Sequence, residues 1–112
     1  MNNHNHQLFP EATPEMSKKR AELAPEQVKA FRNFSKAVFK EGALDEKAKQ
    51  LIAVAVAHVT QCPYCIKGHT KQAKRKGASN EEVMEAIWVA SEMRAGGAYA
   101  HAALAIDEMG KE

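Results

Sequence analysis

Apolar residues recur along this chain three or four positions apart, which is the period of an α-helix. The clearest apolar stripe consists of Val28, Phe31, Phe34 and Val38. We expect this stripe to face the core, on a helix that begins at Pro25 and stops near Gly42. No comparable run alternates with the period of a strand and is bounded by turn residues, so the pattern predicts an all-α fold.

Helix-start signals predict two further helices. Thr13 followed by Pro14 is a cap residue and a first-position proline, which predicts a short helix to about Leu23. Asp45 is a cap residue, and Glu46 after it suits the positive end of a helix. A third helix is therefore predicted to begin there.

The third helix continues into residues 51–59, the most apolar run of the chain. Apolar residues occupy every side of this run, so we expect it to be buried all round. Alternation within residues 53–59 would also suit a strand, but the alanines, the upstream cap and the lack of turn residues favour a helix. Thr60 and Gln61 are predicted to form the break that follows.

A capping box, Ser79-Asn80-Glu81-Glu82, predicts another helix start. One face of that helix would carry Val83, Ile87, Ala90 and Met93. Gly96-Gly97 either ends this helix or allows two backbones to cross closely. Residues 98–109 form a final helix or a continuation, with Gly110 as its stop. Residues 1–13 are expected to be a flexible arm, and residues 14–112 a single helical domain.

Charge and length exclude several classes of protein. The 112 residues carry 16 basic and 14 acidic side chains, a net charge of +2, which argues against a nucleic-acid binder held by electrostatics. The basic cluster at residues 67–76 is interpreted as a solvated helix face. No segment approaches the roughly 20 apolar residues of a membrane span. No signal-peptide pattern begins the chain, so we expect a cytoplasmic protein.

Small side chains dominate the apolar tracts, for example Ala53 to Ala57 and Ala102 to Ala105. Alanine lets helices approach closely but buries less area than leucine, so a small alanine-rich bundle gains stability by assembling. We therefore expect a homo-oligomer.

The sequence Cys62-Pro63-Tyr64-Cys65 holds both cysteines of the chain. Pro63 suits the first position of a helix, which makes Cys62 the cap and places Cys65 in the first turn. The two thiols then share one face and are close enough to interconvert between dithiol and disulfide. The positive helix end favours thiolate, and such motifs lower the pKa of a cysteine. A reducing location makes a catalytic or metal-binding dithiol more common than a structural disulfide.

Two histidines lie at helical spacing from the dithiol. His69 follows Cys65 by four residues and His58 precedes Cys62 by four, so either imidazole could exchange a proton with a thiol. For His58, a core histidine bonded to a carbonyl is the stronger alternative. These four side chains are of the types that bind zinc, but the second ligand pair from a distant segment that such sites usually have is missing. We predict no metal and no cofactor, and the role of His101 stays open.

Several motifs together resemble the carboxymuconolactone decarboxylase superfamily, and its AhpD-like alkylhydroperoxidase branch most closely. They are Leu44-Asp45-Glu46-Lys47, residues 50–57, Cys62-Pro63-Tyr64-Cys65 with His69, Glu85-Ala86-Ile87-Trp88, and residues 94–98. The resemblance implies an AhpD-like helical bundle that assembles into dimers, trimers or hexamers. It also implies a peroxidase that is recycled by a dithiol reductant.

The resemblance further implies individual roles. Cys65 would attack the peroxide oxygen and become a sulfenic acid, Cys62 would resolve it to a disulfide, and His69 would belong to the proton relay. Reasoning from the residues alone instead makes the capping thiol of Cys62 the natural nucleophile for disulfide exchange. We assign peroxide attack to Cys65, because His69 lies one turn away on its face, and contact with the reductant to Cys62.

The chain departs from the AhpD-like pattern at two positions. Gln50 stands where that pattern has a glutamate, and an amide can orient a water but carries no proton in a relay. Glu46, one turn earlier, is a candidate substitute, although a solvated role at the helix start is favoured. Tyr64 stands where the peroxidase branch can carry a histidine. These changes predict weakened peroxidase activity.

Three functional classes follow from the dithiol and the resemblance. The favoured one is a peroxide-reducing or disulfide-exchanging enzyme. The second is a decarboxylase or another ring- or lactone-acting enzyme, which has no need of a Cys-x-x-Cys pair. The third is a non-enzymatic oligomer that senses oxidants through the same disulfide, oxidising once per chain.

Overall fold

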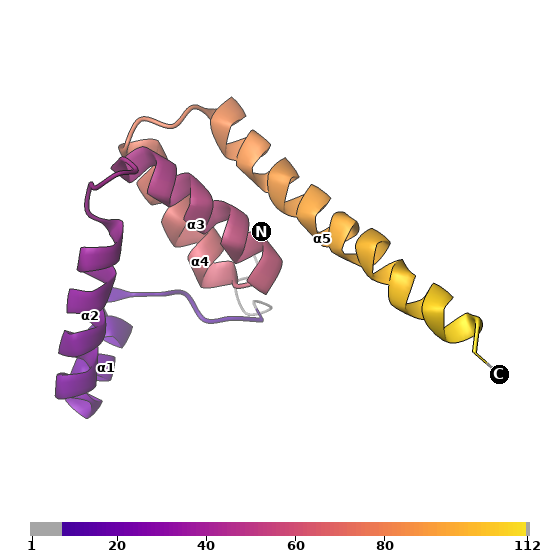
Figure 1. Cartoon of the computed structure of the whole chain (residues 1–112). Coiled ribbons are helices and arrows are strands. Elements are labelled where there is room, and N and C mark those ends of the chain that lie inside the picture. Colours follow the sequence, from indigo (N-terminus) through magenta and orange to yellow (C-terminus); the bar gives the residue numbers. More distant parts are fainter. Residues whose placement is uncertain (1–7, 112) are drawn as a thin grey trace, which may run out of the picture. The chain divides into compact units, whose positions relative to one another are not determined.

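The computed structural model describes residues 8–111, and every regular element within them is helical. The helices are α1 (Pro14–Leu23), α2 (Pro25–Phe39), α3 (Glu46–Thr60), α4 (Pro63–Arg75) and α5 (Asn80–Met109) (Figure 1). The predicted all-α fold is confirmed. The first seven residues of the predicted N-terminal arm lie outside the described part of the chain.

The chain divides into two compact units, with the boundary between Val38 and Phe39. The single domain predicted over residues 14–112 stays a prediction. In the first unit, α1 begins as expected, because the Thr13 hydroxyl accepts a hydrogen bond from the Met16 N–H at 3.2 Å. Arg32 of α2 donates to the Ser17 hydroxyl of α1 at 3.1 Å, which links the two helices.

The apolar stripe of α2 is exposed, so the prediction that it is buried is wrong. Phe31 and Phe34 are 65% and 63% exposed, and their rings contact each other in a tilted pair 6.2 Å apart. Helical spacing identifies the apolar face of a helix but not what covers it. In this unit α1 is ten residues long and largely charged, and it offers too little apolar surface to do so.

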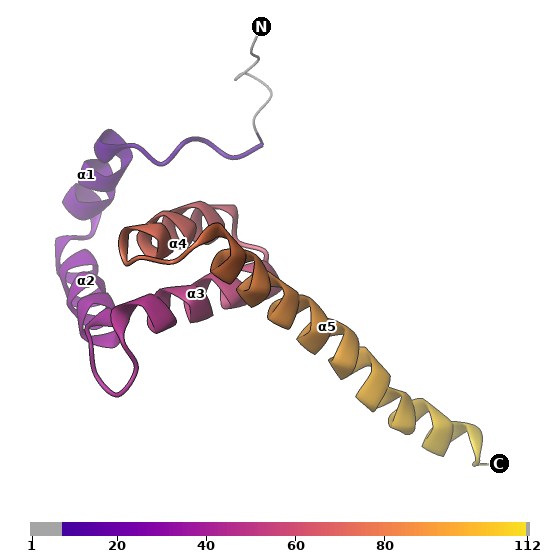
Figure 2. The same ribbon diagram turned by 90° about the horizontal axis from the view of Figure 1, so that it is seen from above.

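The second unit is built on the antiparallel pair α3 and α4, which lie side by side in both views (Figures 1 and 2). The N-terminal part of α5 packs mainly on α3. A small core forms between the three helices from Val54, Ala73 and Ala78, with Leu51, Val83 and Ile87 packed against it. These are short side chains, so the unit buries little apolar area of its own.

The turn between α3 and α4 positions the dithiol. Asp45 caps α3 by accepting a hydrogen bond from the Ala48 N–H at 2.8 Å. Gln61 ends the helix in the left-handed conformation, with a φ of 59°. This reverses the chain direction, so that Cys62 becomes the cap of α4 and Pro63 its first residue. The predicted break and the predicted helix start are both confirmed.

Helix α5 runs without interruption through Gly96-Gly97. Ser79 and Glu82 form the predicted capping box, and Gly110 is the C-cap. Figure 1 shows the helix extending well beyond α3 and α4. No helix of the described residues is long and apolar enough to span a lipid bilayer.

The burial prediction for α3 is wrong in the same way as that for α2. Ile52 and Val56 on α3 are 50% and 51% exposed, although the helix was expected to be buried all round. On α5, Met93 shares the predicted face with Val83 and Ile87, but it lies further along the helix and is exposed. Within the unit, α4 and α5 cover one side of α3, and only the first part of α5 meets another helix.

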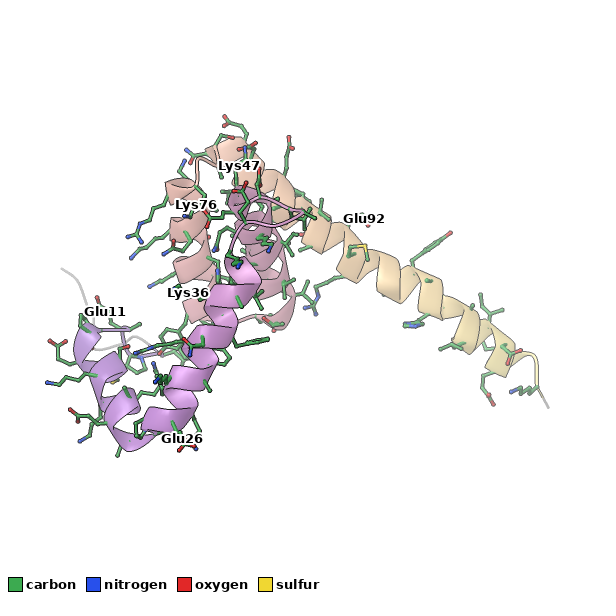
Figure 3. The ribbon with its side chains drawn as sticks, turned by 60° about the vertical axis from the view of Figure 1, so that its left-hand side comes forward. Glu11, Glu26, Lys36, Lys47, Lys76 and Glu92 are labelled. Atoms are coloured by element: carbon green, nitrogen blue, oxygen red, sulfur yellow. The ribbon has the colours of Figure 1, made fainter. Side chains whose placement is uncertain are left out.

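Ion pairs fasten the end of the helical pair that is opposite the dithiol. The ammonium group of Lys47 lies 3.0 Å from the Glu82 carboxylate, and that of Lys76 lies 2.9 Å from the Glu46 carboxylate. Figure 3 shows Lys47 and Lys76 near each other at this end of the unit. The start of α3 is thereby tied to the first turn of α5 and to the end of α4.

Candidate active site

The two thiols meet at the N-terminus of α4. The Sγ atoms of Cys62 and Cys65 are hydrogen-bonded at 2.7 Å, and the Cys65 N–H donates to the Cys62 Sγ at 3.3 Å. Both cysteines are free thiols and half-buried. A disulfide requires the sulfurs to close to roughly 2.0 Å, so a short movement within one helical turn joins them.

The surroundings of the two thiols shift their pKa values in opposite directions. The pKa of Cys62 is lowered, mainly because the Cys65 thiol donates a hydrogen bond to its thiolate, and also because backbone N–H groups of Cys65 and Tyr64 point at it. The pKa of Cys65 is raised, first by that same hydrogen bond to Cys62, then by burial and by the charge on Cys62. The resting pair therefore loses its first proton from Cys62, and the remaining proton is shared along the bond between the sulfurs.

His69 is held by two residues from outside its own helix. Its Nδ1 lies 2.7 Å from the Oε1 of Gln50, a side chain only 7% exposed on the facing turn of α3. Its ring stacks on Phe39, with ring centroids 5.1 Å apart and planes inclined by 23°. Because His69 follows Cys65 by four residues on α4, the two side chains share a helix face. The structure thus joins Cys62 to Cys65 and His69 to Gln50, and helical spacing places His69 on the same face of α4 as Cys65.

The other predicted proton carriers lie in different surroundings. The Nδ1 of His58 bonds to the Val54 carbonyl at 2.8 Å, which is the structural alternative expected for this residue. Glu46 is paired with Lys76 at the far end of α4, so the structure does not bring it to the dithiol. Its position in the first turn of α3 and the length of α4 explain this separation. His101 lies exposed on α5.

Among residues 8–111, no group of three or more histidine, cysteine, aspartate or glutamate side chains is arranged to hold a metal ion. Phe39 is a contact residue of the site that the sequence reasoning missed. The sequence offered one indication: Phe39 is a large apolar residue directly after Val38, and it therefore lies off the face that carries the apolar stripe of α2. Its partner could not be inferred, because His69 is 30 positions further along the chain.

Known proteins are similar to this chain in sequence or in structure. A Paracoccus denitrificans protein named "Uncharacterized protein 4 in cox locus" is 73% identical over 73 residues, which cover 65% of this chain and 66% of that protein. A crystal structure from Methanobacterium thermoautotrophicum superposes with a TM-score of 0.70 at 38% identity, covering 74% of this chain and 93% of that one.

A second crystal structure is that of a carboxymuconolactone decarboxylase family protein from Thermotoga maritima whose involvement in an antioxidative response has been suggested. It matches with a TM-score of 0.55 at 28% identity, over 75% of this chain and 96% of the other. The sequence pattern of the carboxymuconolactone decarboxylase family itself matches residues 25–108, which include all of the site residues above. This chain therefore belongs to the carboxymuconolactone decarboxylase family.

Proposed function

We propose that this protein is a dithiol oxidoreductase of the AhpD type, which reduces a peroxide by forming a disulfide between Cys62 and Cys65. The observation that carries the proposal is the 2.7 Å approach of the two sulfurs at a helix N-terminus. The suggested antioxidative role of the Thermotoga maritima relative supports the same direction.

The proposed reaction begins with one negative charge on the thiol pair. Transfer of the shared proton from Cys65 to Cys62 places that charge on Cys65, whose sulfur attacks the outer peroxide oxygen. The O–O bond breaks, Cys65 becomes a sulfenic acid, and the departing alkoxide takes a proton that His69 delivers from solvent. The Cys62 sulfur then displaces hydroxide, which leaves as water with the Cys62 proton. One peroxide and one proton thus yield the disulfide, an alcohol and water.

Recycling requires two electrons from a dithiol reductant. Its thiolate attacks the disulfide, and Cys62 is the sulfur we assign to this exchange, because it sits at the cap of the helix and not within its first turn. The protein-bound dithiol is regenerated while the reductant becomes a disulfide. Gln50 carries no proton, so a single imidazole serves the relay, and we expect slower turnover than with a carboxylate at that position.

The alternative within the family is a decarboxylase or lactone-acting enzyme, whose chemistry does not consume thiols. The test is peroxide consumption coupled to a dithiol reductant, measured for the wild type and for Cys65→Ser. We expect turnover in the wild type and loss of at least about a hundredfold in the variant, since a hydroxyl is a far weaker nucleophile. A wild type that shows no thiol-dependent peroxide turnover, and whose ring or lactone chemistry survives in Cys65→Ser, would contradict the proposal.

A matched pair of variants tests the proton relay. His69→Gln removes the imidazole beside the dithiol, whereas His101→Gln removes an exposed one on α5. We expect His69→Gln to slow peroxide turnover roughly 10²-fold or more and His101→Gln to leave it near the wild-type rate. Equal effects of the two changes would remove His69 from the mechanism. A sensor, as opposed to an enzyme, would oxidise once per chain without fast recycling.

We also propose that the working form is a homo-oligomer in which a second copy covers the outer part of α5. Large apolar side chains are exposed there, among them Val89, Met93, Tyr99, Leu104 and Ile106. The core within the unit is built from small residues, and a 30-residue helix with an uncovered apolar surface gains most from burial against an identical helix.

A further inference from the structure

Among residues 8–111, Gln50 is the one polar side chain that is buried, and its amide oxygen is hydrogen-bonded to His69. A buried amide needs a hydrogen-bond partner, because an unpaired polar group in an apolar surrounding costs free energy. Its neighbours along α3, Val54 and Leu51, belong to the apolar core. The hydrogen bond between Gln50 and His69 is therefore a buried contact between α3 and α4 and not a solvated surface pair.

An amide oxygen accepts hydrogen bonds and cannot donate them. The Nδ1 of His69, at 2.7 Å from that oxygen, must then carry the hydrogen, which leaves the lone pair of the neutral imidazole on Nε2. Stacking on Phe39 restricts the tilt of the ring, so its plane is fixed together with its hydrogen position. A carboxylate at position 50 would place a negative charge beside His69. The amide of Gln50 orients the imidazole without adding a charge.

We propose that Gln50 is a positioning residue that fixes His69 in the Nδ1–H tautomer, with Phe39 holding the ring, so that Nε2 is the nitrogen that exchanges protons at the thiol pair. This inference rests on the proposed dithiol function for its consequence in turnover, but its structural part is independent of that function. The departure from the AhpD-like pattern at position 50 then preserves the orientation of the histidine and gives up only the second proton carrier.

The direct test is the tautomer of His69, read from the ¹⁵N chemical shifts of its ring in the uniformly labelled full chain at a pH where the ring is neutral. We expect Nδ1 to appear protonated and Nε2 to appear unprotonated. His58 supplies an internal reference in the same spectrum, because its Nδ1 faces a backbone carbonyl and must carry hydrogen too. A wild-type His69 with hydrogen on Nε2 would overturn the proposal.

Two variants separate positioning from packing. Gln50→Leu removes the acceptor and fills the position with an apolar side chain that is slightly shorter, so we expect His69 to shift toward the Nε2–H tautomer while His58 stays unchanged. Gln50→Glu keeps an acceptor oxygen, so the Nδ1–H tautomer is retained. If His69 keeps the same tautomer in Gln50→Leu, Gln50 does not set it and the proposal is wrong.

Peroxide turnover provides the second readout. We expect Gln50→Leu to lose roughly 10- to 100-fold, as is usual when the partner that orients a functional histidine is removed, and Gln50→Glu to match or exceed the wild-type rate, because the carboxylate restores a second proton carrier. A Gln50→Leu variant with shifted tautomer and undiminished turnover would show that the tautomer has no part in the reaction. A wild type without peroxide turnover would contradict the proposed function and leave the tautomer result standing by itself.

Discussion

The sulfur of Cys62 lies 2.7 Å from the sulfur of Cys65, and this single hydrogen bond moves the pKa values of the two thiols in opposite directions. The cap position gives Cys62 the charge and leaves Cys65 with the proton. The two reduced thiols therefore need only a short movement to form a disulfide. A proton that moves along the hydrogen bond transfers the negative charge from one sulfur to the other without solvent.

The lowered pKa of Cys62 predicts its alkylation behaviour. Because a lowered pKa keeps the thiolate populated at more acidic pH, iodoacetamide should modify Cys62 at pH values where an ordinary cysteine is protonated and slow. Cys65→Ala removes the largest cause of the shift, so the midpoint of the alkylation rate at Cys62 should move to higher pH. Peptide mass mapping after timed alkylation measures this, and an unchanged midpoint would contradict the assigned cause.

In the proposed homo-oligomer, we expect two copies of α5 to cross at Gly97. A Cβ at Gly97 or at Gly68 would meet nothing within 4 Å in this chain, and both glycines lie inside helices. By helix propensity alone, each change to alanine should stabilise by about 1 kcal/mol. We expect Gly68→Ala to raise the thermal midpoint with unchanged assembly, and Gly97→Ala to weaken assembly by obstructing a neighbouring backbone.

Light scattering after size-exclusion chromatography measures the assembly of these two variants. If Gly97→Ala assembles as the wild type does and is stabilised like Gly68→Ala, no second copy approaches α5 at that glycine.

Ser79 predicts a stability effect at the start of α5. Its hydroxyl accepts the Glu82 N–H at 3.0 Å, so Ser79→Ala leaves that donor without its cap and should lower the free energy of unfolding by about 1 kcal/mol. Ser79→Asp supplies another capping oxygen and should restore most of the loss. Urea denaturation at fixed protein concentration measures both, and equal midpoints for wild type and Ser79→Ala would show that the cap contributes nothing.

The lowered pKa of Glu82 predicts that this residue contributes to the loss of folding stability at acid pH. Its pKa is lowered, first by the Ser79 backbone N–H and then by the hydrogen bond from Lys47. A carboxyl group with a lowered pKa stabilises the fold above its unfolded-state pKa, and this stabilisation is lost as the pH falls through its folded-state pKa. Glu82→Gln should therefore lose less stability than the wild type between neutral and acid pH, and an identical acid profile would contradict this role.

Local chemistry made much of this fold predictable. Asp45, Cys62, Ser79 and Gly110 act within one turn of their own helix, so their cap roles could be inferred without any tertiary information. Burial could not be inferred in the same way. The aromatic stripe of α2 shows which side is apolar, but not whether the same chain covers it, and here α1 is too short and too charged to do so.

In the candidate site, too, contacts within one helix were predictable and contacts between helices were not. Cys62, Cys65 and His69 share one helix, so their spacing alone predicts that they lie together. The bond between Gln50 and His69 joins positions 19 apart, and the stacking of Phe39 on His69 joins positions 30 apart. Such contacts depend on how α3 and α4 pair, which the hydrophobic pattern does not specify.

The central claim is that Cys62 and Cys65 form one intramolecular disulfide when the protein meets a peroxide. Intact mass measurement and thiol titration of the full chain, before and after stoichiometric peroxide, test this directly. We predict that both thiols disappear, that each chain loses two hydrogen atoms, and that a dithiol reductant restores them. Free thiols that persist, or a gain of oxygen without a disulfide, would contradict the account.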